Sequence, residues 1–166
     1  MSTQTAPRPL PQPNTVRNPI EVVAGLLSRH SVSILQRTFG IVFLAFGVLK
    51  FFPGASPAEE LAGMTIEKLS FGILSGYPAV LFVAVAECIV GLTMLTGLFY
   101  RFGVVVLGMS LAGIVSPLIL FTDRLFPGGL PTLEGQYVFK DLILVGGALV
   151  LAAQALGAKL RAGKEA

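Results

Sequence analysis

The sequence has few of the residue types from which most metal and redox sites are built. Its 166 residues include one cysteine, Cys88, and one histidine, His30. A single cysteine excludes an intrachain disulfide and a site of clustered thiolates, and a single histidine excludes a haem held by two histidines of this chain. The sequence also lacks a glycine-rich phosphate loop and a recognisable nucleophile motif. We therefore expect no metal and no haem, and any redox centre would have to come from another chain.

Charge is scarce as well. Only 13% of the residues are charged and 54% are hydrophobic, whereas soluble domains average about 25% charged residues. A membrane-spanning helix needs about 20 mainly apolar residues, and four windows meet this requirement: 34–52, 79–100, 102–122 and 137–157. The predicted fold class is therefore all-α, an integral membrane four-helix bundle.

A short helix is predicted between the first and second spans. Ser56 and Pro57 precede two acidic residues, Glu59 and Glu60, which is typical of a serine N-cap followed by proline and acids in the first turn. We expect an amphipathic helix over residues 57–69 on the outer face of the bundle. In the third span, Pro117 removes a backbone hydrogen bond and predicts a break.

The segments around the spans have different compositions. Residues 1–19 hold five of the eleven prolines and have no apolar periodicity, which predicts a disordered cytoplasmic tail. Residues 20–33 have a helical pattern that fits either an interfacial helix or a short linker helix. Residues 34–157 form the predicted membrane domain, and residues 158–166 form a basic cytoplasmic tail.

The distribution of charge predicts the orientation in the membrane. The net charge is +3, but the basic residues flank the spans and do not cluster with aromatic residues, so nucleic acid is not an expected partner. Basic residues gather near both termini, and the two loops on the opposite side are mainly acidic. By the positive-inside rule, we expect a multi-pass protein of the cytoplasmic membrane with both termini in the cytoplasm.

Several charges lie inside the predicted spans, where each costs at least about 2.5–3.5 kcal/mol at the helix centre. At 100° per residue, Lys50 shares a helix face with Gly40, Phe43 and Gly47. Glu87 shares a face with Val83, Gly91 and Met94, and Lys140 with Tyr137, Leu144, Gly147, Leu151 and Gln154. Three helices therefore offer a charge and a glycine to one interior.

The depth of these residues suggests that they meet. Lys50 and Lys140 lie about one turn below the outer boundary and Glu87 about two turns below it. Either lysine could therefore reach Glu87. The candidate polar or ligand site comprises Lys50, Glu87, Glu134, Lys140 and Asp141, while Arg37 lies near the cytoplasmic side. No catalytic residue is assigned.

Each charge also has a structural interpretation. Glu87 could form an ion pair that fixes helix register, or it could exchange protons or contact a ligand within the bilayer. Lys50 could extend to the headgroups. Lys140 and Asp141 are neighbours that point about 100° apart, so both cannot face lipid cheaply, which favours internal pairing or function.

Three short motifs occur together in the chain: Arg37-x-x-Gly40 leading to Phe46-Gly47-Val48-Leu49-Lys50-Phe51, Ala86-Glu87-x3-Gly91, and Gly135-Gln136-Tyr137-x2-Lys140-Asp141. In this order they resemble the DoxX family of small four-span membrane proteins, over about residues 34–157. The resemblance implies a four-helix bundle in the bacterial cytoplasmic membrane and kinship with membrane subunits of thiosulfate:quinone oxidoreductase. It assigns no catalytic role to the matching charges.

The resemblance leads to three hypotheses about function. The first is a membrane subunit of a quinone-linked redox assembly, an oxidoreductase subunit rather than a complete enzyme, with a quinone as cofactor. Its partners would be membrane lipid and other redox subunits or further copies of the chain. The second is a non-catalytic scaffold or assembly protein. A small transporter or channel ranks last, because the second half of the third span, beyond Ser110, and the inner half of the fourth offer only Ser110, Ser116 and Gln154 as polar residues.

Overall fold

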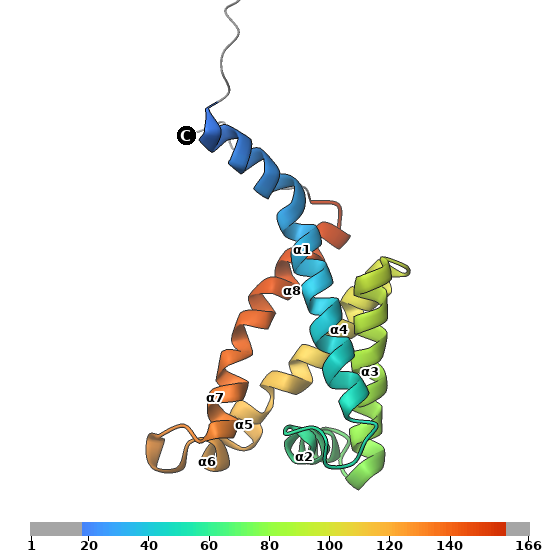
Figure 1. The fold of residues 1–166 in the computed structure, drawn as a ribbon. Helices are drawn as coiled ribbons and strands as arrows, with labels where there is room; N and C mark the ends of the chain where they lie inside the picture. Colours follow the sequence, from blue (N-terminus) through green and yellow to red (C-terminus); the bar gives the residue numbers. More distant parts are fainter. Residues whose placement is uncertain (1–17, 159–166) are drawn as a thin grey trace, which may run out of the picture.

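The computed structural model describes residues 18–158, so the tails predicted at 1–19 and 158–166 lie outside the described residues except for residues 18, 19 and 158. The described residues contain helices and turns and no strand, which confirms the all-α prediction. Four helical segments are long and apolar enough to cross a membrane: Pro19–Leu49, Gly76–Thr96, Tyr100–Leu120 and Leu133–Ala155. Figure 1 shows their arrangement.

The first span is longer than predicted. Helix α1 covers Pro19–Leu49 without interruption, so residues 20–33 are not a separate helix. The Asn18 side chain accepts a hydrogen bond from the Ile20 N–H at 3.2 Å, and Pro19 occupies the first helical position. This cap starts the helix well before the apolar window, and no proline interrupts the helix after its first position. The beginning of α1 projects beyond the ends of the other spans (Figure 1).

The second and third spans form a hairpin. Helix α3 covers Gly76–Thr96 and helix α4 covers Tyr100–Val115. The break predicted at Pro117 is present, because α4 ends before Ser116 and the short helix α5 begins at Pro117 (Pro117–Leu120). Two further short helices follow, α6 (Thr122–Leu125) and the 3-10 helix η1 (Pro127–Gly129).

The fourth span consists of two helices, α7 (Leu133–Lys140) and α8 (Leu142–Ala155). The fourth span predicted at 137–157 is therefore present, and it differs from the predicted window in two respects. It begins earlier, because the Thr132 hydroxyl accepts from the Gly135 N–H at 3.1 Å and caps α7. It is also interrupted at Asp141, whose ψ of −9° departs from regular α-helical geometry.

Helix α2 (Glu59–Leu69) lies across one end of the bundle, which we call the α2 end; the opposite end, where α1 begins and α8 finishes, is the termini end (Figure 1). The predicted Ser56 cap is wrong. Ala58 is the N-cap residue, and the buried Ser56 Oγ has no hydrogen-bond partner among the described residues. Instead, the Glu59 carboxylate accepts from the Gly54 N–H at 2.7 Å and orders the turn before the helix.

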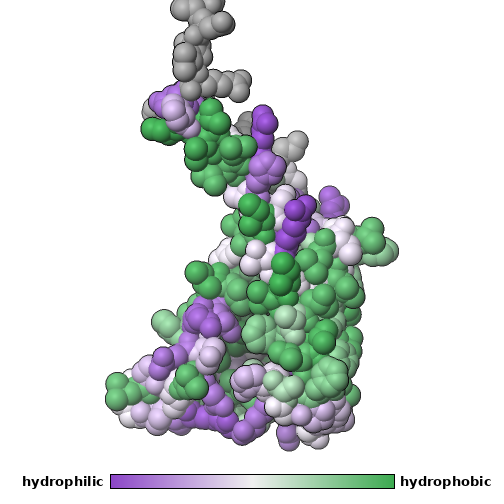
Figure 2. Space-filling model, in the orientation of Figure 1, coloured by the Kyte–Doolittle hydropathy of each residue, from purple (hydrophilic) through white to green (hydrophobic). Residues whose placement is uncertain are grey.

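Two apolar clusters hold the bundle together. The larger cluster joins α1, α3, α4 and α8 in the half near the termini end: Phe39, Phe43, Val90, Met94, Val106, Leu107, Leu111 and Leu151. The smaller cluster lies at the α2 end and joins Leu61, Leu125 and Val138. Figure 2 shows hydrophobic side chains over the middle of the bundle and hydrophilic ones at the α2 end. This distribution fits a bundle surrounded by lipid.

Candidate functional site

The most buried charges among the described residues are Lys50 and Glu87. The Lys50 Nζ donates a hydrogen bond to Glu87 Oε2 at 2.7 Å, and only 4% and 7% of the two side chains are exposed. Lys50 is the C-cap residue of α1, whereas Glu87 lies in the middle of α3. On α3, Glu87 comes one turn before Val90 of the larger cluster, so the pair lies at the edge of this apolar core facing the α2 end.

Glycines bring the two helices of this pair together. A Cβ on Gly47 would lie 3.0 Å from the backbone nitrogen of Cys88 and 3.0 Å from the Glu87 Cβ. One or two turns toward the termini end, Gly40 of α1 lies against Leu95 and Gly91 of α3 against Leu44. The residues buried on α1 are Phe39, Gly40, Phe43 and Gly47, which confirms the predicted glycine face. The lysine that follows this face is thereby directed at α3.

The pair has hydrogen-bonding capacity that the described residues do not use. An ammonium group has three N–H donors, and beyond Glu87 the Lys50 Nζ makes one long contact, 3.5 Å to the Phe46 carbonyl oxygen. Among the described residues, Glu87 accepts a side-chain hydrogen bond only from Lys50, through one of its two carboxylate oxygens. Together the two side chains can therefore donate to one oxygen of a ligand and accept from another polar group.

A second charged group lies at the α2 end. The Arg124 guanidinium of α6 donates from Nε and Nη2 to the two carboxylate oxygens of Glu134 on α7, each at 2.9 Å. The same guanidinium donates from Nη1 to Glu60 on α2 at 3.0 Å. These hydrogen bonds raise the pKa of Arg124 above its ordinary value. Arg124 thus links three helices that are separate in the sequence.

The structure divides the predicted set of site residues. Lys50 and Glu87 are together, whereas Glu134 is paired with Arg124. Lys140 is exposed, and its Nζ lies 4.4 Å from the centre of the Tyr137 ring. Among the described residues, Lys140 and Asp141 form no ion pair. A cluster in which Lys140 reaches Glu87 is therefore not formed.

The reason for this difference is the position of α7. It contacts α4, α5, α6 and α8 but neither α1 nor α3, so Lys140 on α7 does not meet Glu87 on α3. Asp141 itself is half-buried at the junction of the two helices. Arg37 is exposed on α1, thirteen positions before Lys50, and it forms no ion pair in the described part of the chain.

Arg124 is the charged residue that the sequence reasoning missed. One signal was available: the two loops at the α2 end contain five acidic residues and only two basic ones, Lys68 and Arg124. A lone arginine among carboxylates is a natural ion-pair partner. The sequence nevertheless gives no means of choosing among those carboxylates, because Glu60 is 64 residues away from Arg124.

Comparison with known proteins agrees with the first two of the three motifs. The family model described as DoxX matches residues 32–122, more than half of the 166 residues. The matched segment contains Lys50 and Glu87 and ends before Glu134 and Lys140. Neither a curated protein nor a solved structure gives a significant match.

Proposed function

Since the chain belongs to the DoxX family and has four helices able to span a membrane, we propose that it is the membrane subunit of a quinone-linked redox assembly. In this proposal the buried pair of Lys50 and Glu87 binds the quinone headgroup. The single observation that carries the proposal is an ion pair, 2.7 Å long and almost completely buried, between Lys50 at the end of one candidate membrane span and Glu87 in the middle of another. Ionisable residues at such depth are expensive and are commonly retained for function.

The chemistry of the pair suits a quinone. Reducing a quinone to a quinol takes two electrons and two protons, and each carbonyl oxygen becomes a hydroxyl. Lys50 can donate a hydrogen bond to one carbonyl oxygen and so polarise it, while Glu87 can exchange a proton at the same place. The electrons would come from a partner subunit that carries a redox centre.

Ligand binding requires the pair to rearrange. The side chains of Lys50 and Glu87 are almost completely buried and are already paired with each other. A headgroup would therefore have to enter beside the pair, with the Lys50 ammonium moving from Glu87 to the ligand or sharing its donors between them. The long contact between Lys50 and the Phe46 carbonyl oxygen costs little to give up. The headgroup has mainly to replace the buried hydrogen bond between Lys50 and Glu87.

A test begins with purification in mild detergent. The wild-type protein is expected to carry extractable quinone and a redox partner chain, whereas Glu87→Gln is expected to lose most of the quinone. The matched control is Glu134→Gln, which removes a carboxylate from the ion pair at the α2 end. Loss of quinone from both variants alike, or from neither, would remove the assignment of this pair as the site.

A second candidate function is a non-catalytic membrane scaffold, and one observation favours it. The pair lies at the close approach of α1 and α3, where Gly47 contacts Glu87 and Cys88, so it could serve only to fix helix register. For a scaffold, Glu87→Gln lowers the stability in detergent and leaves the redox phenotype of the cell intact at matched protein level. For the redox subunit, the phenotype is lost at matched protein level.

A further inference from the structure

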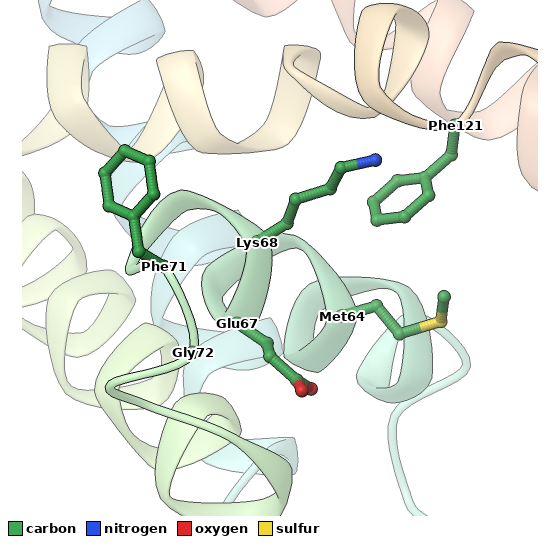
Figure 3. Close-up of a pocket in the computed structure, with 6 residues that line it drawn as sticks. All are labelled: Met64, Glu67, Lys68, Phe71, Gly72 and Phe121. Atoms are coloured by element: carbon green, nitrogen blue, oxygen red, sulfur yellow. The ribbon is translucent and has the colours of Figure 1, made fainter.

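An open pocket of about 470 Å³ lies at the α2 end, and the Lys50–Glu87 pair does not contribute to it. Residues of α2, of the turn that follows it and of the position after α5 line the pocket: Met64, Glu67, Lys68, Phe71, Gly72 and Phe121. Figure 3 shows Lys68 extending toward Phe121 with Phe71 on its other side, while Glu67 and Met64 leave the helix in a different direction. The pocket thus combines a cation, an anion and apolar walls.

The position of the pocket along the bundle indicates which layer of a membrane it contacts. The Lys68 Nζ donates to the Leu120 carbonyl oxygen at 3.1 Å and lies 4.9 Å from the centre of the Phe121 ring. Leu120 is the last residue of the third membrane-spanning segment. Because the apolar core of the bilayer ends near the last residue of a span, the pocket is at the depth of the lipid headgroups.

The two charges of the pocket are available to a ligand. Neither Glu67 nor Lys68 takes part in an ion pair among the described residues. The Lys68 ammonium has donors left beyond its bond to Leu120 and can donate to a phosphate oxygen. The Glu67 carboxylate attracts an ammonium group and repels a second negative charge. The pair of charges therefore favours a headgroup that carries one charge of each sign.

The backbone at Phe71 supports contact with a lipid. Phe71 has a φ of 55°, in the left-handed region, and is 95% exposed. It occupies the position after the C-cap of α2, where the Gly72 N–H donates to the Glu67 carbonyl oxygen at 2.8 Å. Glycine is the usual residue at this position. The left-handed backbone of Phe71 and the exposure of its ring beside the pocket are both explained if the ring contacts the apolar part of a lipid.

We propose that this pocket binds the headgroup of a phospholipid that carries a phosphate and a primary ammonium, as phosphatidylethanolamine does. The phosphate oxygens accept hydrogen bonds from Lys68, the ammonium lies toward Glu67, and the glycerol and first methylene groups contact Phe71 and Phe121. The site does not depend on the quinone proposal, since it uses none of the same residues.

Native mass spectrometry of the purified protein, titrated with single phospholipids, tests the site. Wild-type protein is expected to bind phosphatidylethanolamine about tenfold more tightly than phosphatidylglycerol, a difference that corresponds to one charge contact. Lys68→Gln is expected to weaken phosphatidylethanolamine binding about tenfold, and Glu67→Gln is expected to abolish the preference between the two lipids. Equal binding of both lipids by the wild type would overturn the proposal.

The matched control is Lys140→Gln, since Lys140 is another exposed lysine beside an aromatic ring in the fourth span. Its lipid binding should equal that of the wild type, and a loss as large as that of Lys68→Gln would contradict a specific site. Lys68→Arg keeps the charge and should retain binding, which separates the loss of a contact from a loss of fold. Free phosphoethanolamine should not displace the lipid; displacement would show that the pocket takes a soluble phosphoryl amine.

Discussion

Gly91 of α3 lies so close to Leu44 of α1 that a Cβ on Gly91 would be 2.6 Å from the Leu44 Cβ and 2.7 Å from the Leu44 backbone nitrogen. Because one of these atoms belongs to the backbone, Gly91→Ala must move the two helices apart. We expect it to lower the free energy of unfolding by about 1–3 kcal/mol, the usual cost of overfilling a packed interior. Unfolding of the purified protein in detergent, followed by circular dichroism, measures the change.

Gly108→Ala is the control for this prediction. Gly108 is also inside a membrane-spanning helix, but a Cβ there would meet no atom within 4 Å. Its free energy of unfolding should stay within about 0.5 kcal/mol of the wild-type value. Equal destabilisation by both substitutions would mean that the close contact between α1 and α3 is not the cause of the lost stability.

The Tyr100 hydroxyl ties α4 to α8 near the termini end. It lies 3.0 Å from the Leu151 carbonyl oxygen and 3.0 Å from Gln154 Oε1, and it can donate to either acceptor. Tyr100→Phe should lower the free energy of unfolding by about 0.5–1.5 kcal/mol, the net value of a hydrogen bond. Tyr137→Phe removes a hydroxyl that forms no hydrogen bond among the described residues, and it should have no measurable effect in the same assay.

Arg124 fixes the α2 end through its fork of two hydrogen bonds to Glu134. Arg124→Lys keeps the charge but loses the fork. Because the side chains of Arg124 and Glu134 are 33% and 36% exposed, the free energy of unfolding should fall by about 1 kcal/mol or less. Hydrogen exchange of residues 122–140 should become faster, while Arg101→Lys at the termini end should leave this segment unchanged. Faster exchange in both variants would argue against a specific link between Arg124 and Glu134.

The pH dependence of this protection follows from the pKa of Arg124. The pKa is raised in the folded protein, so the contribution of Arg124 to stability is fully present below the ordinary arginine pKa and is lost only as the pH rises through the higher folded value. Protection of residues 122–140 from exchange should therefore persist from neutral to moderately alkaline pH, after correction for the intrinsic exchange rate. A loss of protection in that range would contradict a fork held by Arg124.

The helix faces near the buried pair were predictable from the sequence alone. On α1, a spacing of three or four residues between Gly40, Phe43, Gly47 and Lys50 puts them on one side of any regular helix. The same rule gave the face of Glu87 on α3. These predictions succeeded because both helices are regular through the residues concerned.

The positions of Lys140 and Glu134 were not predictable in the same way. The prediction for Lys140 required α7 to lie against α3, whereas α7 packs against α6 in the smaller apolar cluster and has no contact with α3. The partner of Glu134 depends on the loop that brings Arg124 to α7, and a single sequence carries no information about that geometry. Helical periodicity therefore assigns faces within one helix, whereas pairs between irregular segments require the tertiary structure.

The most direct test of the proposed quinone site is a titration of the purified protein with a short-chain quinone, comparing the wild type with the double variant Lys50→Met and Glu87→Leu. Removing both charges together avoids leaving one of them buried without a partner, so the bundle should remain folded. If Lys50 and Glu87 hold the headgroup, the wild type binds the quinone and the folded double variant binds at least tenfold more weakly. Equal dissociation constants for the two proteins would contradict the site.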